Sequence, residues 1–400
     1  MRWCRNICYT QKRLGVPKSK FQKLQNRGEI MKQGRSLKDA KAERAAKKRR
    51  AKRRRRAFVL IAEIFTLFIL LGIGYVMNKY DKIQLNLFNE GEIQFNKGVE
   101  QEHYKTIALF GGDSRDGQLE AGTHADTIMI ASIDEDTKEV KLVSIYRDLL
   151  TKQNSGKVKK ANNAYFTGGP KDAINMLNKN FDLAIEDYVT VDFGAFADVV
   201  DLLGGIEIEV SKEEAAEMNR HIVGTAQSVG SKKSYYMKGG LQNLDGVEAV
   251  TYSRIRKNVG GDYGRTERQR IVIQKLVEKV KQTDISTLNK IIDEVFSQVS
   301  TSFTLKEIIS LAAGVMQYDL GETSGFPFER TDGSVEGIGS VVIPLGVVEN
   351  VEELHTFLYP KDTDYEVSDT VKEIANEIET LSGYTRADYK EPSAGDDEAE

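Results

Sequence analysis

The chain has 400 residues, two cysteines and a formal net charge of −3, but its charge is unevenly distributed. Residues 1–56 carry 22 Lys and Arg against three acidic residues, a net charge of +19, which leaves −22 for the remainder. Both cysteines, Cys4 and Cys8, lie in this basic arm, so the acidic part has no disulfide framework. It must be stabilised by its own hydrophobic core, for which it is long enough.

An apolar run follows the basic arm at residues 57–77 and contains one charged residue, Glu63. As an α-helix rising about 1.5 Å per residue, it would span a hydrocarbon core of roughly 30 Å. The basic block 47–56 directly precedes it, which predicts a cytoplasmic N-terminus and residues 78–400 outside the cell. The run is too long for a typical signal-peptide core, and no small-residue cleavage site follows it closely. We therefore predict a single-pass protein of the cell membrane, of the Gram-positive type.

The basic arm has two interpretations. Its charge could bind nucleic-acid phosphates, but residues 31–56 show no helix-turn-helix pattern and no zinc-ligand spacing. A disordered segment lying against anionic membrane lipid is the simpler interpretation, so nucleic acid is the less favoured partner. Within the arm, codons for residues 27–29 can resemble a ribosome-binding site placed suitably before Met31. This pattern predicts that translation starts at Met31 and that residues 1–30 are not translated.

Residues 78–103 are predicted to form a polar stalk, residues 104–383 a catalytic domain, and residues 384–400 an acidic disordered tail. Apolar runs that end in turn residues predict strands at 105–112, 126–134, 139–148, 188–193, 206–210, 251–256 and 339–344. Helical spacing predicts helices at 168–181, 194–205, 266–282, 285–299, 304–318 and 350–359. Strands that alternate with helices predict an α/β fold. We expect an αβα sandwich around a mixed central sheet, preceded by one transmembrane helix.

Charged residues lie at or next to an end of three of the predicted strands. Asp113 and Arg115 lie in the glycine-rich turn after the strand 105–112, and Asp126 begins the next strand. Strand ends are where ligands gather in α/β sheets, and paired carboxylates are a plausible site for Mg²⁺. Arg147 ends the third strand. The alternative is an ordinary turn in which the Asp side chain bonds to the backbone and the Arg is solvated.

Further arginines fall in two later segments. Arg254 and Arg256 alternate along the predicted strand 251–256, so we expect them on one side of the sheet and Lys257 pointing away. Arg265 and Arg268 are three residues apart at the start of a helix, share its face, and have Gln269 beside them. Arginine binds phosphate bidentately, and helix N-termini favour anions. The set predicts a site for a metal-bound pyrophosphate, although a sulfate or cell-wall surface site would need no metal.

Seven segments, in this order, carry a resemblance to a known family. They are "FGGDSR", "ADTIMI", "VKLVSIYRD", "KKANNAY", "VDFGAFADVVDLLGGIEIEV", "GLQNLDGVEAVTYSRIR" and "DYGRTERQR". Together they resemble the LytR–CpsA–Psr family over residues 104–282. The resemblance implies an extracytoplasmic phosphotransferase that moves a teichoic acid-like or capsular glycopolymer from a polyprenyl-pyrophosphate carrier to peptidoglycan. An apolar tunnel for the polyprenyl chain would be lined by 171–181 and 194–203.

The resemblance also implies residue roles. Asp113 and Asp126 would be the Mg²⁺ ligands. The resemblance does not assign the general base, for which Asp113 and Asp262 are the candidates. The implied catalytic residues are Asp113, Arg115, Asp126, Arg147 and Asp262, and the implied substrate-binding residues are Arg254, Arg256, Arg265, Arg268, Gln269 and Asn162.

The chain departs from the family pattern at two places. His124 and Ala125 stand where the family usually has Arg-Ser, and Tyr146 stands where it usually has Pro. These departures bear on substrate preference more than on activity. Two other functions stay open: a pyrophosphatase that uses water on the same lipid, and a membrane-bound transcriptional attenuator acting through residues 31–56.

Overall fold

The computed structural model describes residues 83–99, 101–112, 119–231, 236–314 and 316–389, with isolated residues between 23 and 80. The chain divides into two compact units, residues 1–77 and 78–400, and the second contains all that follows. Most of the basic arm, the apolar run 57–76, Asp113, Arg115 and residues 390–400 of the predicted tail lie outside the described residues. Residues 384–389, predicted as the start of a disordered tail, are described and contain a 3₁₀ turn at Arg386–Asp388. Among the described helices, none has both the length and the apolar composition needed to cross a membrane.

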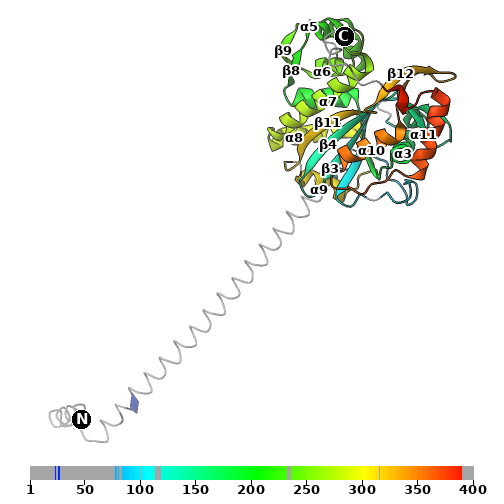
Figure 1. Cartoon of the computed structure of the whole chain (residues 1–400). Helices are drawn as coiled ribbons and strands as arrows, with labels where there is room; N and C mark the ends of the chain where they lie inside the picture. Colours follow the sequence, from blue (N-terminus) through cyan, green and yellow to red (C-terminus); the bar gives the residue numbers. More distant parts are fainter. Residues whose placement is uncertain are drawn as a thin grey trace. The chain divides into compact units, whose positions relative to one another are not determined.

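A seven-stranded mixed sheet forms the centre of the second unit (Figure 1). Its order is β1-β10-β7-β2-β3-β4-β11. The strands are β1 (Gln84–Leu85), β2 (Tyr104–Gly112), β3 (Ala125–Asp134), β4 (Glu139–Ile145), β7 (Asp187–Asp192), β10 (Val299–Thr301) and β11 (Asp319–Phe326). β3 is antiparallel to β2 and β4, whereas β2–β7 and β4–β11 are parallel pairs. The predicted α/β class and mixed central sheet are confirmed.

Helices cover both faces of this sheet because side chains alternate along each strand. On one face, Ala108 and Phe110 of β2 belong to the main core, which includes α3 (Asn162–Phe181), α10 (Val347–Leu358) and α11 (Asp369–Ser382). These three helices lie together on the right of Figure 1. On the other face, Ile107 packs in a smaller cluster that includes Leu311 of α9 (Leu305–Gly314).

The helix α3 begins six residues before its predicted start at 168. Its backbone leaves helical geometry at Gly168 and Gly169, directly before Pro170. Proline lacks the N–H that would continue the helix and its ring clashes with the preceding turn, so the chain kinks there. Gly169 adopts a φ of +68°, which favours glycine. The prediction therefore found the second half of the helix and missed the first.

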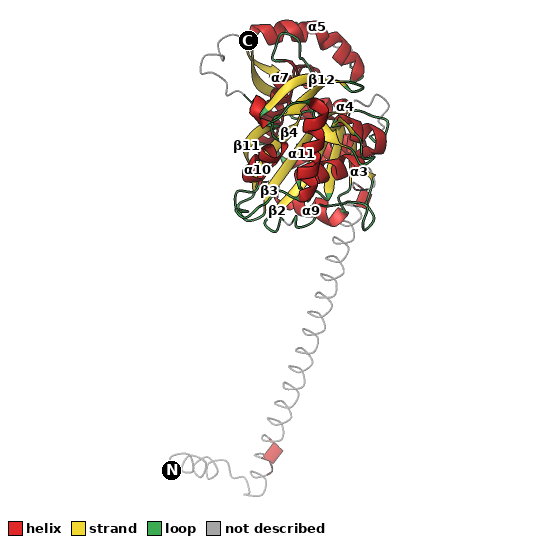
Figure 2. Cartoon of the chain, turned by 45° about the vertical axis from the view of Figure 1, so that its right-hand side comes forward, coloured by secondary structure: helices red, strands yellow, loops and turns green. Residues whose placement is uncertain are grey.

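A second core lies within the same unit, in the segment 193–281. It comprises α4 (Phe193–Leu202), β8 (Ile206–Val210), α5 (Lys212–Ser228), β9 (Gly240–Leu244), α6 (Gly246–Tyr252) and α7 (Gly261–Lys281). β8 and β9 form an antiparallel ribbon, and they lie with α5 at the top of Figure 1. The same segment is at the top of Figure 2, where α5 is drawn as a long red helix.

The predicted strand 251–256 is wrong. Residues 251–252 end helix α6, and Ser253 is its C-cap. The helix forms because Asp245 and Glu248 make a capping box at its start, each side chain accepting from the other's backbone N–H. A cap and four buried apolar or small residues outweigh the strand preference of Thr251 and Tyr252.

The remaining elements complete the unit. They are β5 (Leu150–Lys152), β6 (Val158–Lys160), α8 (Ile285–Val295), β12 (Arg330–Val335), β13 (Gly339–Pro344) and two short 3₁₀ turns. Residues 83–99, expected as part of a stalk, lie against the sheet and α3. β1 pairs with β10, and the backbone N–H of Gln94 donates to Asn175 Oδ1 at 2.8 Å.

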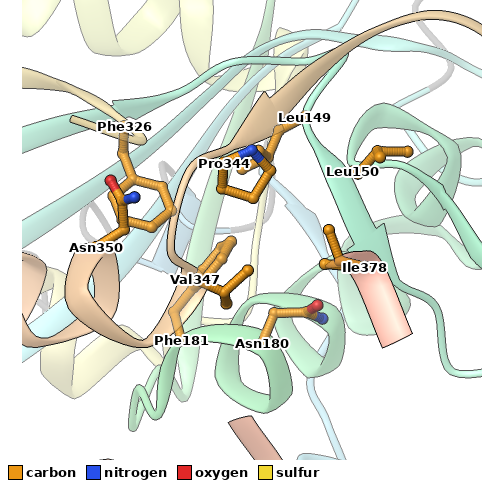
Figure 3. A pocket seen from close by; sticks show the side chains of 9 residues that line it. All are labelled: Leu149, Leu150, Asn180, Phe181, Phe326, Pro344, Val347, Asn350 and Ile378. Carbon is orange, nitrogen blue, oxygen red and sulfur yellow. The ribbon is translucent and has the colours of Figure 1, made fainter. Parts of the chain in front are cut away.

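A small apolar cavity lies inside the main core (Figure 3). Its volume is about 10 Å³, which is room for one water molecule at most. Phe181 of α3 lines it, together with Phe326 and Val347. Other apolar residues of the predicted tunnel wall, Ile174 and Leu177, are buried in core packing. This cavity is too small for a polyprenyl chain.

Candidate active site

Asp126 and Arg147 meet at one edge of the central sheet. β3 and β4 are antiparallel, and continuing their register from Met129–Ser144 places Asp126 opposite Arg147. Nη1 of Arg147 lies 2.7 Å from Oδ1 of Asp126, and Nε lies 3.4 Å from Oδ2 of Asp148. Burial lowers the pKa of Arg147, but the two carboxylates outweigh it and raise that pKa overall. The two predicted strand-end residues are thus brought together.

A large cavity, which we call the arginine cavity, opens beside this pair. It has a volume of about 800 Å³ and receives side chains from β3, α4, α5, α7 and the turn after α6. It is lined by Asp126, Phe193, Glu217, His221, Gly224, Thr225, Gln227, Ser228, Arg254, Arg256, Lys257, Arg265 and Gln269. Such a volume is typical of ligand sites, and the cations make an anion the expected ligand.

Arg265 is the most informative residue of the arginine cavity. It is 3% exposed, and its Nε and Nη1 have no hydrogen-bond partner among the described residues. Nη1 lies 3.3 Å from Oδ1 of Asp262, an ion pair without hydrogen-bond geometry. Burial lowers the pKa of Arg265 to about 10, and nearby Arg256 and Arg147 act in the same direction. Burying guanidinium nitrogens without hydrogen-bond acceptors costs stability unless a bound anion supplies those acceptors.

Arg254 and Arg256 reach the arginine cavity from the turn after α6. The guanidinium of Arg254 lies 4.5 Å from the ring centre of Phe193, and Nε of Arg256 lies 3.1 Å from Oδ1 of Asp262. Lys257 lines the same cavity, so the expectation that it points away is wrong. The alternation that separates neighbours on a strand does not apply in a turn.

Arg268 does not line the arginine cavity. Its Nη2 donates to the carbonyl of Ile255 at 2.6 Å and its Nη1 to that of Val259 at 2.9 Å. Nη1 also lies 3.4 Å from Oε1 of Glu214. Arg268 therefore holds the turn that carries Arg254 and Arg256. Gln269, the next residue along α7, does line the cavity.

A second cavity, which we call the lysine cavity, shares Asp126 with the first. Its volume is about 590 Å³, and it lies among β3, β6, the start of α3 and the β12–β13 hairpin. It is lined by His124, Asp126, Arg147, Asp148, Lys159, Lys160, Asn162, Asn163, Gly337 and Ile338. Asn162, predicted to bind substrate, lies here and not with Arg254, Arg256 and Arg265. Asp126 borders both cavities, so they adjoin at the Asp126–Arg147 pair.

Several lining residues were missed from the sequence. Glu217 on α5 is 1% exposed and is paired with Arg220 at 2.6 Å and His221 at 3.0 Å. The capping box of Ser211 and Glu214 could have revealed α5. Lys159 and Lys160 stand three and two residues before Asn162 in the sequence, and this proximity could have revealed them.

His124 and Tyr146, one residue from each of the two departures from the family pattern, each contact an aromatic ring. The ring of His124 stacks on Phe166, with centroids 4.3 Å apart and planes inclined by 11°. Tyr146 packs edge-on against Tyr263, and Arg330 lies over both rings, at 4.9 Å and 4.3 Å.

Among the described residues, no group of three or more His, Cys, Asp and Glu is placed to hold a metal. Asp126 is the described member of the predicted metal pair, and Asp113 lies outside the described residues.

Comparison with known proteins identifies the class to which this fold belongs. The sequence model of the LytR_cpsA_psr family matches residues 73–343, and the chain belongs to that family. It is 30% identical over 192 residues to the polyisoprenyl-teichoic acid–peptidoglycan teichoic acid transferase TagV of Bacillus subtilis. That match covers 47% of each protein, so the chain spans about half the length of this relative.

Solved structures show the same fold. A structure described as TagT bound to LIIa-WTA is 20% identical, with a TM-score of 0.54, covering 69% of this chain and 98% of that one. A structure of TagT with bound octaprenyl pyrophosphate lipid is 20% identical, with a TM-score of 0.50, covering 68% and 99%. At these identities the likeness is one of fold.

Proposed function

We propose that the chain transfers an anionic glycopolymer, teichoic acid-like or capsular, from a polyprenyl-pyrophosphate carrier to peptidoglycan, forming a phosphodiester. The observation that carries this proposal is the buried guanidinium of Arg265. Two of its nitrogens have no hydrogen-bond partner among the described residues, and its cavity contains further cations. Pyrophosphate oxygens would supply the missing acceptors in the fork geometry that arginine prefers. The activity named for the TagV relative and the lipid bound in the TagT structure support the same substrate class.

The proposed reaction is an in-line displacement. A hydroxyl oxygen of peptidoglycan attacks the phosphorus nearer the glycopolymer and forms a new P–O bond. The bond from that phosphorus to the bridging oxygen breaks, and its electron pair leaves with polyprenyl phosphate. Arg254, Arg256 and Arg265 would stabilise the charge on the departing phosphate, and Asp113 or Asp262 would accept the hydroxyl proton.

We propose Mg²⁺ as the cofactor. Asp126 at the junction of the two cavities offers the hard carboxylate oxygen that Mg²⁺ prefers, and this ion needs only one or two carboxylates because waters and substrate phosphates complete its shell. Asp126 and Asp113 would hold it. When bound, it would neutralise charge on the phosphate oxygens.

The test uses the full chain in detergent, a lipid-linked polymer and peptidoglycan. The expected product is polymer joined covalently to peptidoglycan. Release of free polymer phosphate in the presence of peptidoglycan, with none joined, would mean that the protein is a pyrophosphatase. Arg265→Ala should lower transfer roughly ten- to a hundredfold, because a charge-assisted contact contributes about 1.5–3 kcal/mol. Omitting Mg²⁺ should stop transfer, and Asp126→Asn should abolish the response to added Mg²⁺.

A further inference from the structure

The lysine cavity is a second binding site next to the first. The two cavities adjoin at Asp126, and Arg147, which pairs with that carboxylate, lines the lysine cavity. A transfer reaction with two substrates needs a place for each, on either side of the atom that changes bonds. A ligand in the lysine cavity would therefore lie beside a phosphate bound in the arginine cavity.

The charges in the two cavities differ in a way that assigns their ligands. In the lysine cavity, Asp148 neutralises two of the cations: its carboxylate lies 3.0 Å from Nζ of Lys160 and 3.4 Å from Nε of Arg147. In the arginine cavity, Asp262 lies within ion-pair distance of Arg256 and Arg265, but Nε and Nη1 of the buried Arg265 still have no hydrogen-bond partner among the described residues. Arg254 and Lys257 add two further cations to the lining of this cavity. A dianionic pyrophosphate thus fits the arginine cavity better, and the lysine cavity fits a polar ligand of low charge.

Two side chains of the lysine cavity are available to such a ligand. The ammonium of Lys159 makes no ion pair with any described residue, and the amide of Asn162 makes no side-chain hydrogen bond to one. An amide offers both donors and an acceptor, which matches sugar hydroxyl and acetamido groups. The ammonium matches a carboxylate on a peptide stem. Lys159 lies in β6 and Asn162 is the first residue of α3, so regular structure fixes the backbone from which both side chains extend.

An aromatic surface lies at the same place. His124 lines the lysine cavity, and Phe166, which stacks on it, is 40% exposed. A partly exposed aromatic ring near the free amide of Asn162 can pack against the apolar face of a sugar ring while the amide binds its hydroxyls.

We infer that the lysine cavity binds the acceptor, an N-acetylated glycan strand bearing peptide stems. This inference rests on the proposed function, because it names the second substrate of that reaction. The acceptor hydroxyl then approaches the phosphorus from the Asp126–Arg147 side. The polyprenyl phosphate departs on the arginine side, as in-line displacement requires.

The first experiment measures binding alone and does not depend on turnover. A soluble, uncrosslinked peptidoglycan fragment is titrated into the full chain in detergent without donor lipid, by calorimetry. Lys159→Gln should weaken its binding about tenfold, the loss of one charge-assisted contact. Lys157→Gln is the matched control, since Lys157 is exposed in the same β5–β6 hairpin and lines neither cavity. No binding by the wild type, or equal binding by Lys159→Gln and the wild type, overturns the inference.

The second experiment separates the two substrates. Phe166→Ala and Lys159→Gln should each raise the acceptor concentration that gives half-maximal transfer, while the affinity for donor lipid, measured without acceptor, stays within about twofold. If donor affinity falls and the acceptor dependence does not change, the lysine cavity belongs to the donor. A wild type that does not consume donor would contradict the proposed function, and the binding titration would still decide whether the cavity takes the glycan.

Discussion

Arg265 and Arg268 show how two arginines of one helix can have opposite roles. Both are buried at the start of α7 and lie three residues apart, as the sequence predicted. Both terminal nitrogens of Arg268 donate hydrogen bonds to the protein, which leaves only its Nε without a partner among the described residues. Nε and Nη1 of Arg265 both lack a hydrogen-bond partner among these residues, and Arg265 lines a cavity. The bonds of Arg268 stabilise the protein without ligand, whereas the guanidinium of Arg265 is left to bind a ligand.

This contrast predicts opposite effects on stability. Arg265→Met should leave the free energy of unfolding unchanged or raise it by about 1 kcal/mol, because a poorly compensated buried charge is removed and Asp262 keeps Arg256 as its partner. Arg268→Met should lower it by about 3 kcal/mol, because Glu214 and two carbonyls lose their partner. Urea unfolding of both variants without ligand gives the comparison. A loss of stability in Arg265→Met equal to that in Arg268→Met would mean that Arg265 is structural.

Some site residues could be predicted from the sequence, and others could not. Asp126 and Arg147 were predicted because each adjoins a long apolar run that could only be a buried strand. The position of Lys257 was mispredicted because its backbone is a turn, and a turn has no fixed period. Lys159 was missed because a lysine before a helix reads as an ordinary solvated residue until the cavity around it is known.

At the scale of elements, α6 matters most because the turn that follows it carries Arg254 and Arg256. The helix has only seven residues, too few to be stable by propensity, so its cap and its buried face hold it. The side chain of Asp245 accepts from the backbone N–H of Glu248 at 3.0 Å. The position of the two arginines therefore depends on a residue at the far end of the helix.

Asp245→Ala should reveal this dependence. Loss of the cap should lower the free energy of unfolding by about 1 kcal/mol and weaken the binding of donor lipid, because α6 frays and the turn moves. Asp284→Ala is the control, since Asp284 caps α8 in the same manner but lines neither cavity. It should lower the thermal midpoint while donor affinity stays unchanged. If both variants bind donor lipid as tightly as the wild type, the position of the turn after α6 does not depend on the Asp245 cap.

Strands whose sequence is a clear apolar or alternating run were predicted with accurate bounds. β2, β3, β8 and β13 are short apolar or alternating runs and were predicted within one residue at each end. α5, β9, β11 and α11 were not assigned, because their residues are mostly polar and become ordered by packing against distant parts of the chain. The pairing of β4 with β11 joins residues far apart in sequence, and no local pattern encodes it.

At the scale of the whole molecule, a buried histidine makes the free energy of unfolding depend on pH. His355 is buried, stacks on Tyr365 with centroids 3.5 Å apart, and its Nε2 lies 2.9 Å from the carbonyl of Phe181. Burial lowers the pKa of His355 from 6.5 to about 4. The unfolded chain therefore binds a proton between these pH values while the folded chain does not, so stability falls as pH falls through this window.

Acidification from pH 7 to pH 4 should cost up to about 3 kcal/mol through His355 alone. His355→Gln keeps a donor for the Phe181 carbonyl but has no group that titrates, so it should be less pH-dependent between pH 6.5 and 4. Urea unfolding at pH 7, 5.5 and 4 measures the difference. Asp134, whose pKa is lowered to about 2, acts only at lower pH and does not confuse the comparison. Parallel pH curves for the two proteins would refute this account.

Topology is also a property of the whole chain. The basic block 47–56 predicts that the N-terminus stays inside, so protease added to intact protoplasts should digest residues 78–400. An epitope tag at the N-terminus should survive until the membrane is opened. Survival of the second unit in intact protoplasts would place it in the cytoplasm.

The separation of the main core from the second core, in the segment 193–281, has a consequence for the motions of the unit. Asp126 extends from the sheet of the main core, whereas Arg254, Arg256 and Arg265 belong to the segment built around the second core. A donor that contacts both Asp126 and these arginines binds only while the two cores stay together. Opening of the second core must then break the contacts to the donor as well as the contacts within that core. Amide hydrogens of α5 and the β8–β9 ribbon should therefore exchange more slowly with deuterium when donor is bound. Those at the centre of β3, already protected by the main core, should exchange at an unchanged rate.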